Sequence, residues 1–413
     1  MNSYRIAGID IHKKMLAVVV TDAGESELTF ERRKFGSTAE QIAQLAQWLE
    51  TLSVQAVVME STAQYWKPVW RELERRFQTY LAQAHSNRAP RGRKRDFADA
   101  ERLVRRFVCG ELILSFVPDA EQRMWRTLTH TKHQLTKDRT RLLNQLEAFL
   151  EDSHIKLSSF VSAIKGVSCR RILDALSGGE TDPAQLAAMA DPGLKATPEQ
   201  LQDALSEART LDCDRRRLLR LSLKRLELIE EQIAEIHALT AQRLREHNDA
   251  VVRLAEIPGL GPASAQQIIA EVGPQAAAFP SAAQMASWIG VCPGREESAE
   301  ESRSNRSPKG NRPMRRILNQ AANAAIKAKG CVFETLYRRL VPRFHHNKAI
   351  WAVAHRLARV IWKILHARVR YEERGIRTNP AAAKKRASRL VSQLRRLGYE
   401  VTVAKRQTPT VPA

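Results

Sequence analysis

Two long stretches of the chain place apolar residues seven positions apart, and this spacing limits the folds open to the middle of the protein. The repeating positions are Leu128, Leu135, Leu142 and Phe149 in the first stretch, and Leu219, Leu226 and Ile233 in the second. A seven-residue apolar repeat forms one stripe along a helix, and another helix must cover that stripe. We therefore expect two arms of a coiled coil, although an ordinary helical bundle fits the same spacing.

The first 82 residues carry a different pattern, made of short runs rich in β-branched residues. Four such runs predict β-strands, at residues 4–11, 15–22, 28–35 and 54–60. Residues 39–52 have helical spacing and separate the third run from the fourth. This order indicates a mixed sheet with helices on its faces. The expected fold class is an α/β N-terminal domain, then a long helical region, then a mainly α-helical C-terminal domain.

The charge balance favours a polyanionic partner. The 413 residues include 67 Lys and Arg against 45 Asp and Glu, which gives a net charge of +22. Binding a phosphate backbone releases its counterions, so nucleic acid is the expected partner. A membrane surface is the competing polyanion, but no run approaches the ~20 apolar residues of a spanning helix. The N-terminus lacks the features of a signal peptide, so we expect a cytoplasmic protein. The five cysteines are far apart, which argues against a zinc site and predicts reduced packing residues.

Four carboxylates stand out as candidate metal ligands. Asp10 lies within an apolar strand, where a carboxylate is costly unless it faces a cation or water, and Glu60 ends another such strand. Asp96 and Asp99 are three apart and share one face of a predicted helix. Convergence of these groups would give the oxygen ligands that Mg²⁺ or Mn²⁺ requires for phosphodiester chemistry. Taken singly, they could mark strand ends, an N-cap, or an ion pair with Arg95.

The segment "IPGLGPASA" has the form of a helix-hairpin-helix. Gly259 and Gly261 would let backbone amides approach a phosphate at the N-terminus of the following helix. A plain joint between two helices is the alternative.

The segment "CPGREESAEESRSNRSPKGN", residues 292–311, contains four serines and almost nothing apolar, which predicts a surface loop. Cations around it would suit a phosphoryl centre, although each fits a solvated surface equally well. These cations are Arg295, Arg303, Arg306 and Lys309, and the basic helices that follow add Arg315 and Arg316 as candidate nucleic-acid contacts. Farther on, Trp351 and Trp362 could stack on bases, but their helical spacing favours a core role.

Five motifs in this order resemble the 110 family of insertion-sequence transposases. They are "GIDIHKK", "VVMESTAQYW", "KRDFADA", "IPGLGPASA" and "GVCPGREES…SPKGNRPMRR". The resemblance extends from residue 5 to about residue 370. It implies a RuvC-like domain of ribonuclease H type, a coiled coil for dimerisation, and a C-terminal transposase domain with a nucleophilic serine. The implied boundaries are residues 1–118, 119–248 and 249–372, followed by a basic tail at 373–413.

The resemblance also implies roles for individual residues. The family's acidic quartet falls on Asp10, Glu60, Asp96 and Asp99. The family's serine follows a proline by five positions, which points from Pro293 to Ser298. The usual next residue is glycine, whereas this chain has Ala299, so Ser302 stays open as the alternative nucleophile.

The resulting hypothesis is a metal-dependent recombinase that cuts and rejoins donor and target DNA through Ser298. By resemblance, a noncoding bridge RNA would guide it, and the chain would form a dimer through the coiled coil and a tetramer as a dimer of dimers. A RuvC-type structure-specific endonuclease that uses water is the first alternative. A non-catalytic nucleic-acid scaffold is the second.

Overall fold

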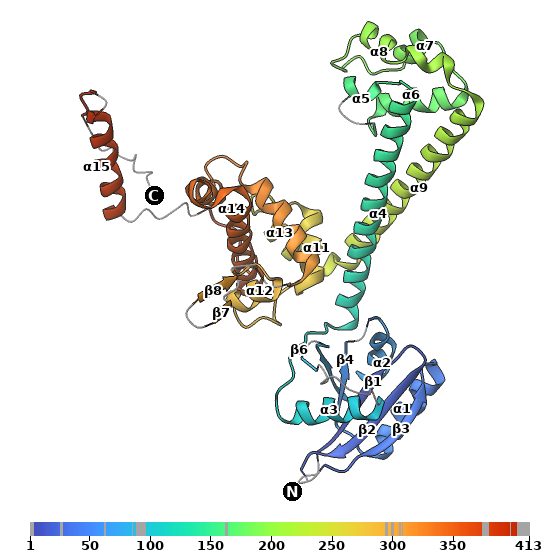
Figure 1. The fold of residues 1–413 in the computed structure, drawn as a ribbon, viewed down its shortest axis with the longest axis vertical. Coiled ribbons are helices and arrows are strands. Elements are labelled where there is room, and N and C mark those ends of the chain that lie inside the picture. The colour runs from blue at the N-terminus through green and yellow to red at the C-terminus, as the bar shows by residue number, and fades with distance from the viewer. Residues whose placement is uncertain are drawn as a thin grey trace. The chain divides into compact units, whose positions relative to one another are not determined.

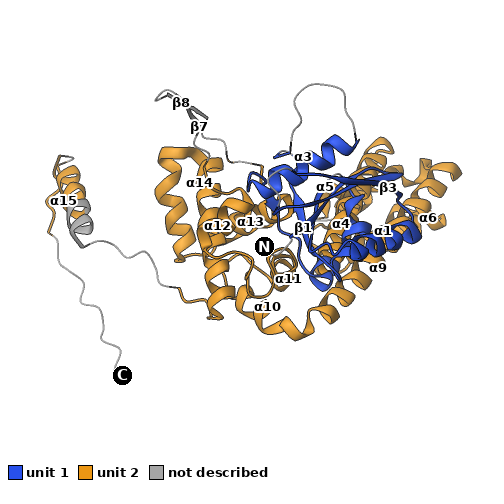
Figure 2. Ribbon diagram, turned by 90° about the horizontal axis from the view of Figure 1, so that it is seen from below, with its two compact units in different colours: residues 1–124 blue, residues 125–413 orange. Residues whose placement is uncertain are grey.

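A computed structural model describes residues 4–24, 28–61, 63–84, 86–87, 96–161, 164–293, 296–298, 301–304, 307, 309–373, 380–396 and 398–402. The chain forms two compact units, residues 1–124 and residues 125–413 (Figure 2). The finer division at residues 118, 248 and 372 stays a prediction.

The first unit is built on a six-stranded mixed sheet with the order β3-β2-β1-β4-β5-β6 (Figure 1). β2 pairs antiparallel with β1 and β3, β4 pairs parallel with β1 and β5, and β6 pairs antiparallel with β5. The four strands expected from the sequence are all present, and the last two were not predicted. The strands are β1 (Arg5–Ile11), β2 (Met15–Asp22), β3 (Glu31–Gly36), β4 (Ala56–Glu60), β5 (Gln78–Ala82) and β6 (Leu114–Ser115).

Helices cover the two faces of this sheet, as the pattern of buried residues requires. α1 (Ala39–Thr51) and α2 (Trp66–Leu73) pack on the face that carries Ala7, Ile9 and the other alternate residues. α3 (Asp96–Val108) packs on the opposite face against Ile6 and Val58. The expected α/β architecture of the N-terminal part is therefore confirmed.

The second unit is mainly helical and contains two long helices near its start. α4 (Ala120–Asp152) begins at the end of the first unit, and α9 (Cys213–Arg243) returns after a cap of short helices (Figure 1). The cap contains α5 (Leu157–Phe160), α6 (Val167–Gly178), α7 (Pro183–Ala188), α8 (Pro198–Ala204) and η1 (Ser206–Thr210).

The apolar residues of the two seven-residue repeats differ in how deeply they are buried. Leu142, Leu219 and Leu226 are buried in a core shared with α6, whereas Leu135 and Ile233 are half-buried. Toward the start of α4 and the end of α9, Lys132 Nζ lies 2.9 Å from His237 Nδ1. The paired coiled coil itself stays a prediction.

The rest of the second unit surrounds one large apolar core. That core joins residues of α10 through α14, including Leu254, Ile269, Ile289 and Leu318. Two exposed cysteines, Cys109 and Cys213, are not the packing residues expected, although all five cysteines are free. No helix among the described residues is long and apolar enough to cross a bilayer. The remaining elements are η2 (Arg245–His247), α10 (Asn248–Ala255), α11 (Pro262–Val272), α12 (Ala282–Ile289), β7 (Glu296–Ser298), β8 (Glu301–Ser304), α13 (Arg312–Ala325), α14 (Val332–Ala367) and α15 (Pro380–Arg396).

Candidate active site

The sheet places Asp10 and Glu60 side by side. β1 and β4 are parallel, and Ile9 is paired with Met59, so Asp10 and Glu60 are the next residues in register at the ends of the two strands. Neighbouring strands lie about 4.8 Å apart, and in-register residues of a parallel pair point to the same face. The two acidic residues thus lie side by side at the ends of neighbouring strands, on the face that α3 covers.

Gly8 brings α3 close to that edge. A Cβ atom at Gly8 would lie 2.7 Å from the Ala100 carbonyl oxygen and 2.5 Å from Val104 Cγ2, both on α3. The absence of a side chain therefore allows the helix to pack almost directly on β1. Because Asp96 and Asp99 lie in the first turn of α3, this close packing brings their carboxylates toward Asp10.

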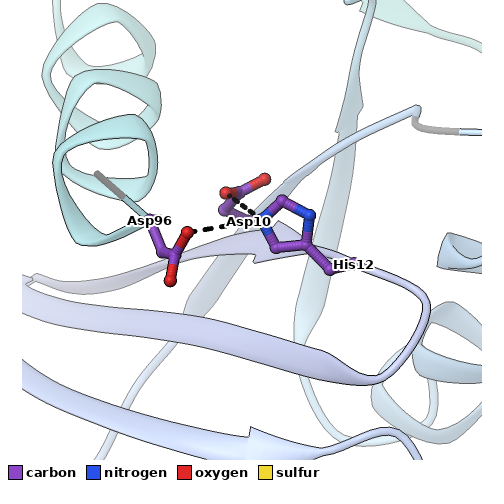
Figure 3. A group of neighbouring side chains, drawn as sticks. All are labelled: Asp10, His12 and Asp96. Atoms are coloured by element: carbon purple, nitrogen blue, oxygen red, sulfur yellow. Dashed lines mark ion pairs between the residues drawn. The ribbon is translucent and has the colours of Figure 1, made fainter. Parts of the chain in front are cut away.

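Asp10, His12 and Asp96 form a cluster at this point (Figure 3). His12 Nε2 lies 3.0 Å from Asp10 Oδ2 and 3.7 Å from Asp96 Oδ1. Lys34 Nζ, from β3, donates to Asp96 Oδ2 at 3.0 Å. Two cationic or potentially cationic groups therefore lie against the acids.

The electrostatics of Asp10 fit a cation site. Burial raises the pKa of the Asp10 carboxyl, the nearby Asp99 and Asp96 raise it further, and His12 only partly offsets them. Asp10 Oδ2 is buried and lies against His12 Nε2. By contrast, a hydrogen bond from Lys34 lowers the pKa of Asp96. A divalent cation would relieve the repulsion at Asp10, and carboxylate oxygens are the ligands that Mg²⁺ and Mn²⁺ prefer.

The other two acids of the predicted quartet have different partners in this structure. Glu60 Oε2 accepts a hydrogen bond from Asn87 Nδ2 at 2.8 Å, and Asp99 Oδ1 accepts one from Arg102 Nη2 at 2.5 Å. The structure thus groups Asp10 with Asp96, places Glu60 beside Asp10 by register, and turns Asp99 toward its own helix.

Sequence reasoning missed His12 and Lys34 as members of the cluster. A signal for His12 was present, because His12 follows Asp10 by two just after the end of β1, and residues two apart in an extended chain share a face. Lys34 comes from a strand two positions away in the sheet, and the sequence holds no local signal for that contact.

Gly8→Ala should loosen this site by displacing α3. The added methyl group meets a backbone oxygen, so we expect a loss of about 1–3 kcal/mol in the free energy of unfolding. The acids on α3 would move with the helix, and Mg²⁺ should then stabilise the variant less than the parent. Urea denaturation with and without Mg²⁺ measures both effects.

Gly178→Ala is the matched control, because a Cβ atom at Gly178 meets nothing within 4 Å. We expect it to be neutral or slightly stabilising. Equal stability and equal Mg²⁺ response of Gly8→Ala and the parent would contradict the close packing of α3.

The serine-rich segment contains two paired strands where the sequence predicted a loop. β7 and β8 are antiparallel, with Ser298 opposite Glu301 and Glu297 opposite Ser302. We call residues 291–310 the serine hairpin. The pairing arises because backbone hydrogen bonding does not require apolar side chains, which were the signal that the sequence lacked. Of the cations expected near the serines, Arg295 and Arg306 lie outside the described residues, and the structure gives the strand position of Arg303.

The two ends of the serine hairpin are joined at its base. Gly290 ends α12 in a left-handed conformation, with φ 78°. Asn311 donates its backbone N–H to the Trp288 carbonyl at 3.2 Å, and Arg315 donates to the Gly290 carbonyl. Gly310 packs so closely that a Cβ atom there would lie 2.1 Å from the Ile289 oxygen. The chain therefore leaves and re-enters the helical core at one point.

The remaining cations of the predicted interface have defined surroundings. Arg315 lies over the Trp351 ring, 4.4 Å from its centroid, and Arg316 donates to Gln267 at 2.8 Å. Lys309 is exposed. Trp362 donates from its indole to the Phe279 carbonyl at 2.8 Å, which agrees with a core role for this residue.

The two glycines of the predicted hairpin between α10 and α11 differ in their surroundings. Gly259 has φ 86°, and a Cβ atom there would lie 2.3 Å from the Ala321 carbonyl oxygen. Gly261 precedes α11 as its N-cap, and a Cβ atom there would meet nothing within 4 Å. Packing on α13 explains the first glycine, whereas the second borders open space at a helix N-terminus.

Comparison with known proteins matches two segments of the chain to family models of transposases. Residues 7–155 match a family model described as a transposase, of the DEDD type found in IS110 elements. Residues 251–338 match a model described as the transposase IS116/IS110/IS902 family.

Curated relatives agree with these matches. A putative transposase y4pF/y4sB of Sinorhizobium fredii is 26% identical over 291 residues, which are 68% of this chain and 64% of the relative. The chain thus spans a little less than two thirds of that protein. The transposase for insertion sequence element IS1111A of Coxiella burnetii is 25% identical over 377 residues, which are 88% of this chain and 90% of the relative.

Among solved structures, T. thermophilus RuvC in complex with Holliday junction substrate matches 27% of this chain and 99% of its own, at 16% identity and a TM-score of 0.20. A member of the Ppx/GppA family from Aquifex aeolicus matches 56% of this chain at 9% identity and a TM-score of 0.16.

Proposed function

The chain belongs to the IS110 family of insertion-sequence transposases, and we propose that it is a metal-dependent recombinase that cuts and rejoins donor and target DNA. The observation that carries this proposal is the cluster at the end of β1. Half-buried Asp10 lies beside Glu60 by register and faces Asp96 across His12. Carboxylates grouped in this way suit Mg²⁺ or Mn²⁺, and a bound divalent cation would supply Lewis-acid stabilisation to a phosphodiester under attack.

Within this proposal each acid has a role that its position supports. Asp10, Glu60 and Asp96 would hold the cation, and Asp99 would join them on leaving Arg102. Lys34, already paired with Asp96, would hold that carboxylate in its ionised form. The α/β unit thus provides the metal-binding half of the chemistry.

Ser298 is the proposed nucleophile, on the family's pattern of a serine five positions after proline. Its Oγ would form a bond to phosphorus while the phosphorus–oxygen bond of the DNA strand breaks, and the leaving oxygen would take up a proton. The covalent phosphoserine keeps the phosphodiester energy for rejoining, so no other energy source is needed. Ser302, which is paired with Glu297 on the neighbouring strand, is the alternative.

A noncoding guide RNA is the proposed source of sequence specificity. The net charge of +22 suits contacts to nucleic-acid backbones, and the sequence has no evident base-reading motif. Base pairing by a guide would provide the readout that such a surface lacks. Gly261 at the open N-terminus of α11 is the position best placed to meet a phosphate, whereas the packing of Gly259 makes it a structural partner in that turn.

The test is a cleavage assay on the full chain, purified with the nucleic acid that accompanies it. Element-end DNA and Mg²⁺ are added, and the products are separated under denaturing conditions. Cut and rejoined DNA together with a protein–DNA adduct would support the recombinase. Cutting without an adduct, and with oxygen from labelled water in the product, would show an endonuclease. Binding without cutting would show a scaffold. If the RNA guides target choice, ribonuclease treatment should abolish cutting of the target.

Dimerisation is proposed to use α9. Leu221 and Leu228 are 57% and 52% exposed, and they lie seven residues apart on a side of the helix that faces away from the buried Leu219 and Leu226. Leu218 and Leu239 extend the same side. A second copy of the helix would cover this apolar stripe, and two such dimers would form the tetramer.

Leu221→Glu combined with Leu228→Glu should convert dimers to monomers. Burying a carboxylate in an apolar contact costs more than about 1.4 kcal/mol, so the dissociation constant should rise at least about tenfold. Sedimentation over a range of concentrations measures it. Ala234→Glu, also exposed but on another side of α9, should leave the mass unchanged. An unchanged mass in the double variant would exclude this stripe.

A further inference from the structure

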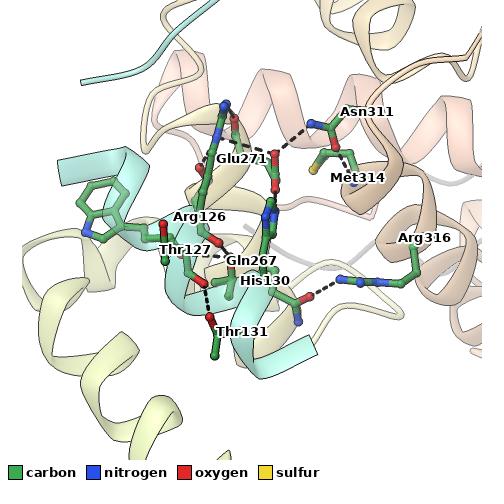
Figure 4. A network of polar contacts seen from close by, with 12 residues as sticks. Arg126, Thr127, His130, Thr131, Gln267, Glu271, Asn311, Met314 and Arg316 are labelled. Atoms are coloured by element: carbon green, nitrogen blue, oxygen red, sulfur yellow. Dashed lines mark hydrogen bonds and ion pairs between the residues drawn. The ribbon is translucent and has the colours of Figure 1, made fainter. Parts of the chain in front are cut away.

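Beneath the base of the serine hairpin lies a carboxylate that the proposed chemistry does not use. Glu271, on α11, is 2% exposed. His130 Nε2 lies 2.6 Å from its Oε1, and Asn311 Nδ2 donates to its Oε2 at 2.9 Å (Figure 4). Arg126 adds a charge contact at 3.7 Å from Oε2. The partners come from α4 and from Asn311, the N-cap residue that precedes α13.

These partners keep Glu271 ionised. Burial alone would raise the pKa of its carboxyl, but the hydrogen bond from His130, the charge of Arg126 and the hydrogen bond from Asn311 outweigh burial, so the pKa lies below its usual range. At neutral pH the site therefore contains a buried carboxylate, and its charge is what attracts donors from two other helices.

Asn311 is the point where this cluster reaches the serine hairpin. Its Oδ1 accepts from the Met314 N–H at 2.8 Å and so caps α13, while its Nδ2 is committed to Glu271. Its backbone N–H closes the hairpin base onto Trp288. Three bonds from one residue therefore join the end of the hairpin, the start of α13 and the buried carboxylate.

We infer that Glu271 is a positioning residue, which acts through Asn311 to hold the base of the serine hairpin in a fixed place against α4. The inference rests on the proposed function, in which a serine of that hairpin attacks DNA. A buried charge network seldom stabilises a fold more than apolar packing would, so stability alone is a weak reason for this cluster. Its location at the base of the serine hairpin gives a functional reason for the cluster, because a small misplacement of a reacting group lowers the rate steeply.

Asn311→Ser separates positioning from folding. Serine caps a helix about as well as asparagine, so α13 should stay capped, but its side chain is too short to reach Glu271. We expect the single-turnover rate of adduct formation at saturating DNA to fall at least tenfold, with DNA affinity close to the parent and with a melting temperature lowered only by the loss of one hydrogen bond to the buried carboxylate. Asn323→Ser, in the same helix and bonded to the Asn319 carbonyl, should change none of these quantities.

A double-mutant cycle with Glu271→Gln tests whether Asn311 acts through the carboxylate. If it does, the rate of the double variant should be no lower than that of Glu271→Gln alone, because both changes remove one interaction. Multiplied rate losses would overturn the inference, and so would a parent-like rate in Asn311→Ser. If Glu271→Gln does not fold, the comparison of Asn311→Ser with Asn323→Ser still tests the inference. A parent chain that cuts DNA without an adduct would instead remove the proposed function.

Discussion

We expect Ser298→Ala to abolish the protein–DNA adduct and strand rejoining, while the variant still binds DNA and the proposed guide RNA. The reason is chemical: alanine has no oxygen to form the phosphoserine, and metal-bound acids alone cannot store the bond energy needed to rejoin strands. By analogy with other serine nucleophiles, the rate should fall at least about a thousandfold. Single-turnover assays with element-end DNA measure the rate, and mass spectrometry of the digested adduct identifies the modified residue.

Ser302→Ala is the matched control, because Ser302 lies on the strand paired with that of Ser298. It should cut and rejoin DNA at close to the parent rate. The reverse result, with the adduct lost in Ser302→Ala and kept in Ser298→Ala, would assign the nucleophile to Ser302. An adduct retained in both variants would exclude both serines.

The sequence predicted the first four strands and the first helix of the α/β unit well because its signals there are local. Asp10 and Glu60 each sit at the end of an apolar strand, and Asp96 and Asp99 share one helical turn. The parallel pairing of β1 and β4 then places Asp10 and Glu60 next to each other in register. The role of Gly8 was not predicted, because it depends on packing against Ala100 and Val104 of α3, which lie 92 and 96 residues later in the sequence.

The parts that the sequence could not predict depend on contacts between distant residues. Glu271 looks like any polar residue on a helix, and its burial follows from Arg126 and Asn311, which are 145 and 40 positions away. Likewise, Arg315 and Arg316 read as candidates for phosphate contact, but the fold gives them partners in Gly290 and Gln267. The seven-residue repeats predicted the two long helices, whereas a core shared with the cap buries Leu142, Leu219 and Leu226 of their apolar positions.

Asp10→Asn should abolish DNA cutting without unfolding the protein. Asparagine keeps the size of the side chain but removes the charge that would hold the cation, so the rate should fall at least about a hundredfold. In the parent, the fold raises the pKa of Asp10, so its ionised form costs stability, and this cost grows as pH rises through the interval between the unfolded and folded pKa values. Above that interval, and without metal, the variant should therefore melt at the same temperature as the parent or higher.

Adding Mg²⁺ then separates the two proteins, because a ligand stabilises only the state that binds it. The melting temperature of the parent should rise with Mg²⁺ concentration, and that of Asp10→Asn should stay nearly constant. Asp22→Asn is the control, since Asp22 ends β2 at the opposite end of the β1–β2 pair, opposite Arg5, and accepts a hydrogen bond from the Gly24 N–H. It should respond to Mg²⁺ as the parent does. Parent-like cutting by Asp10→Asn would show that this carboxylate does not hold the catalytic cation, and the chemistry would have to be assigned to other acids.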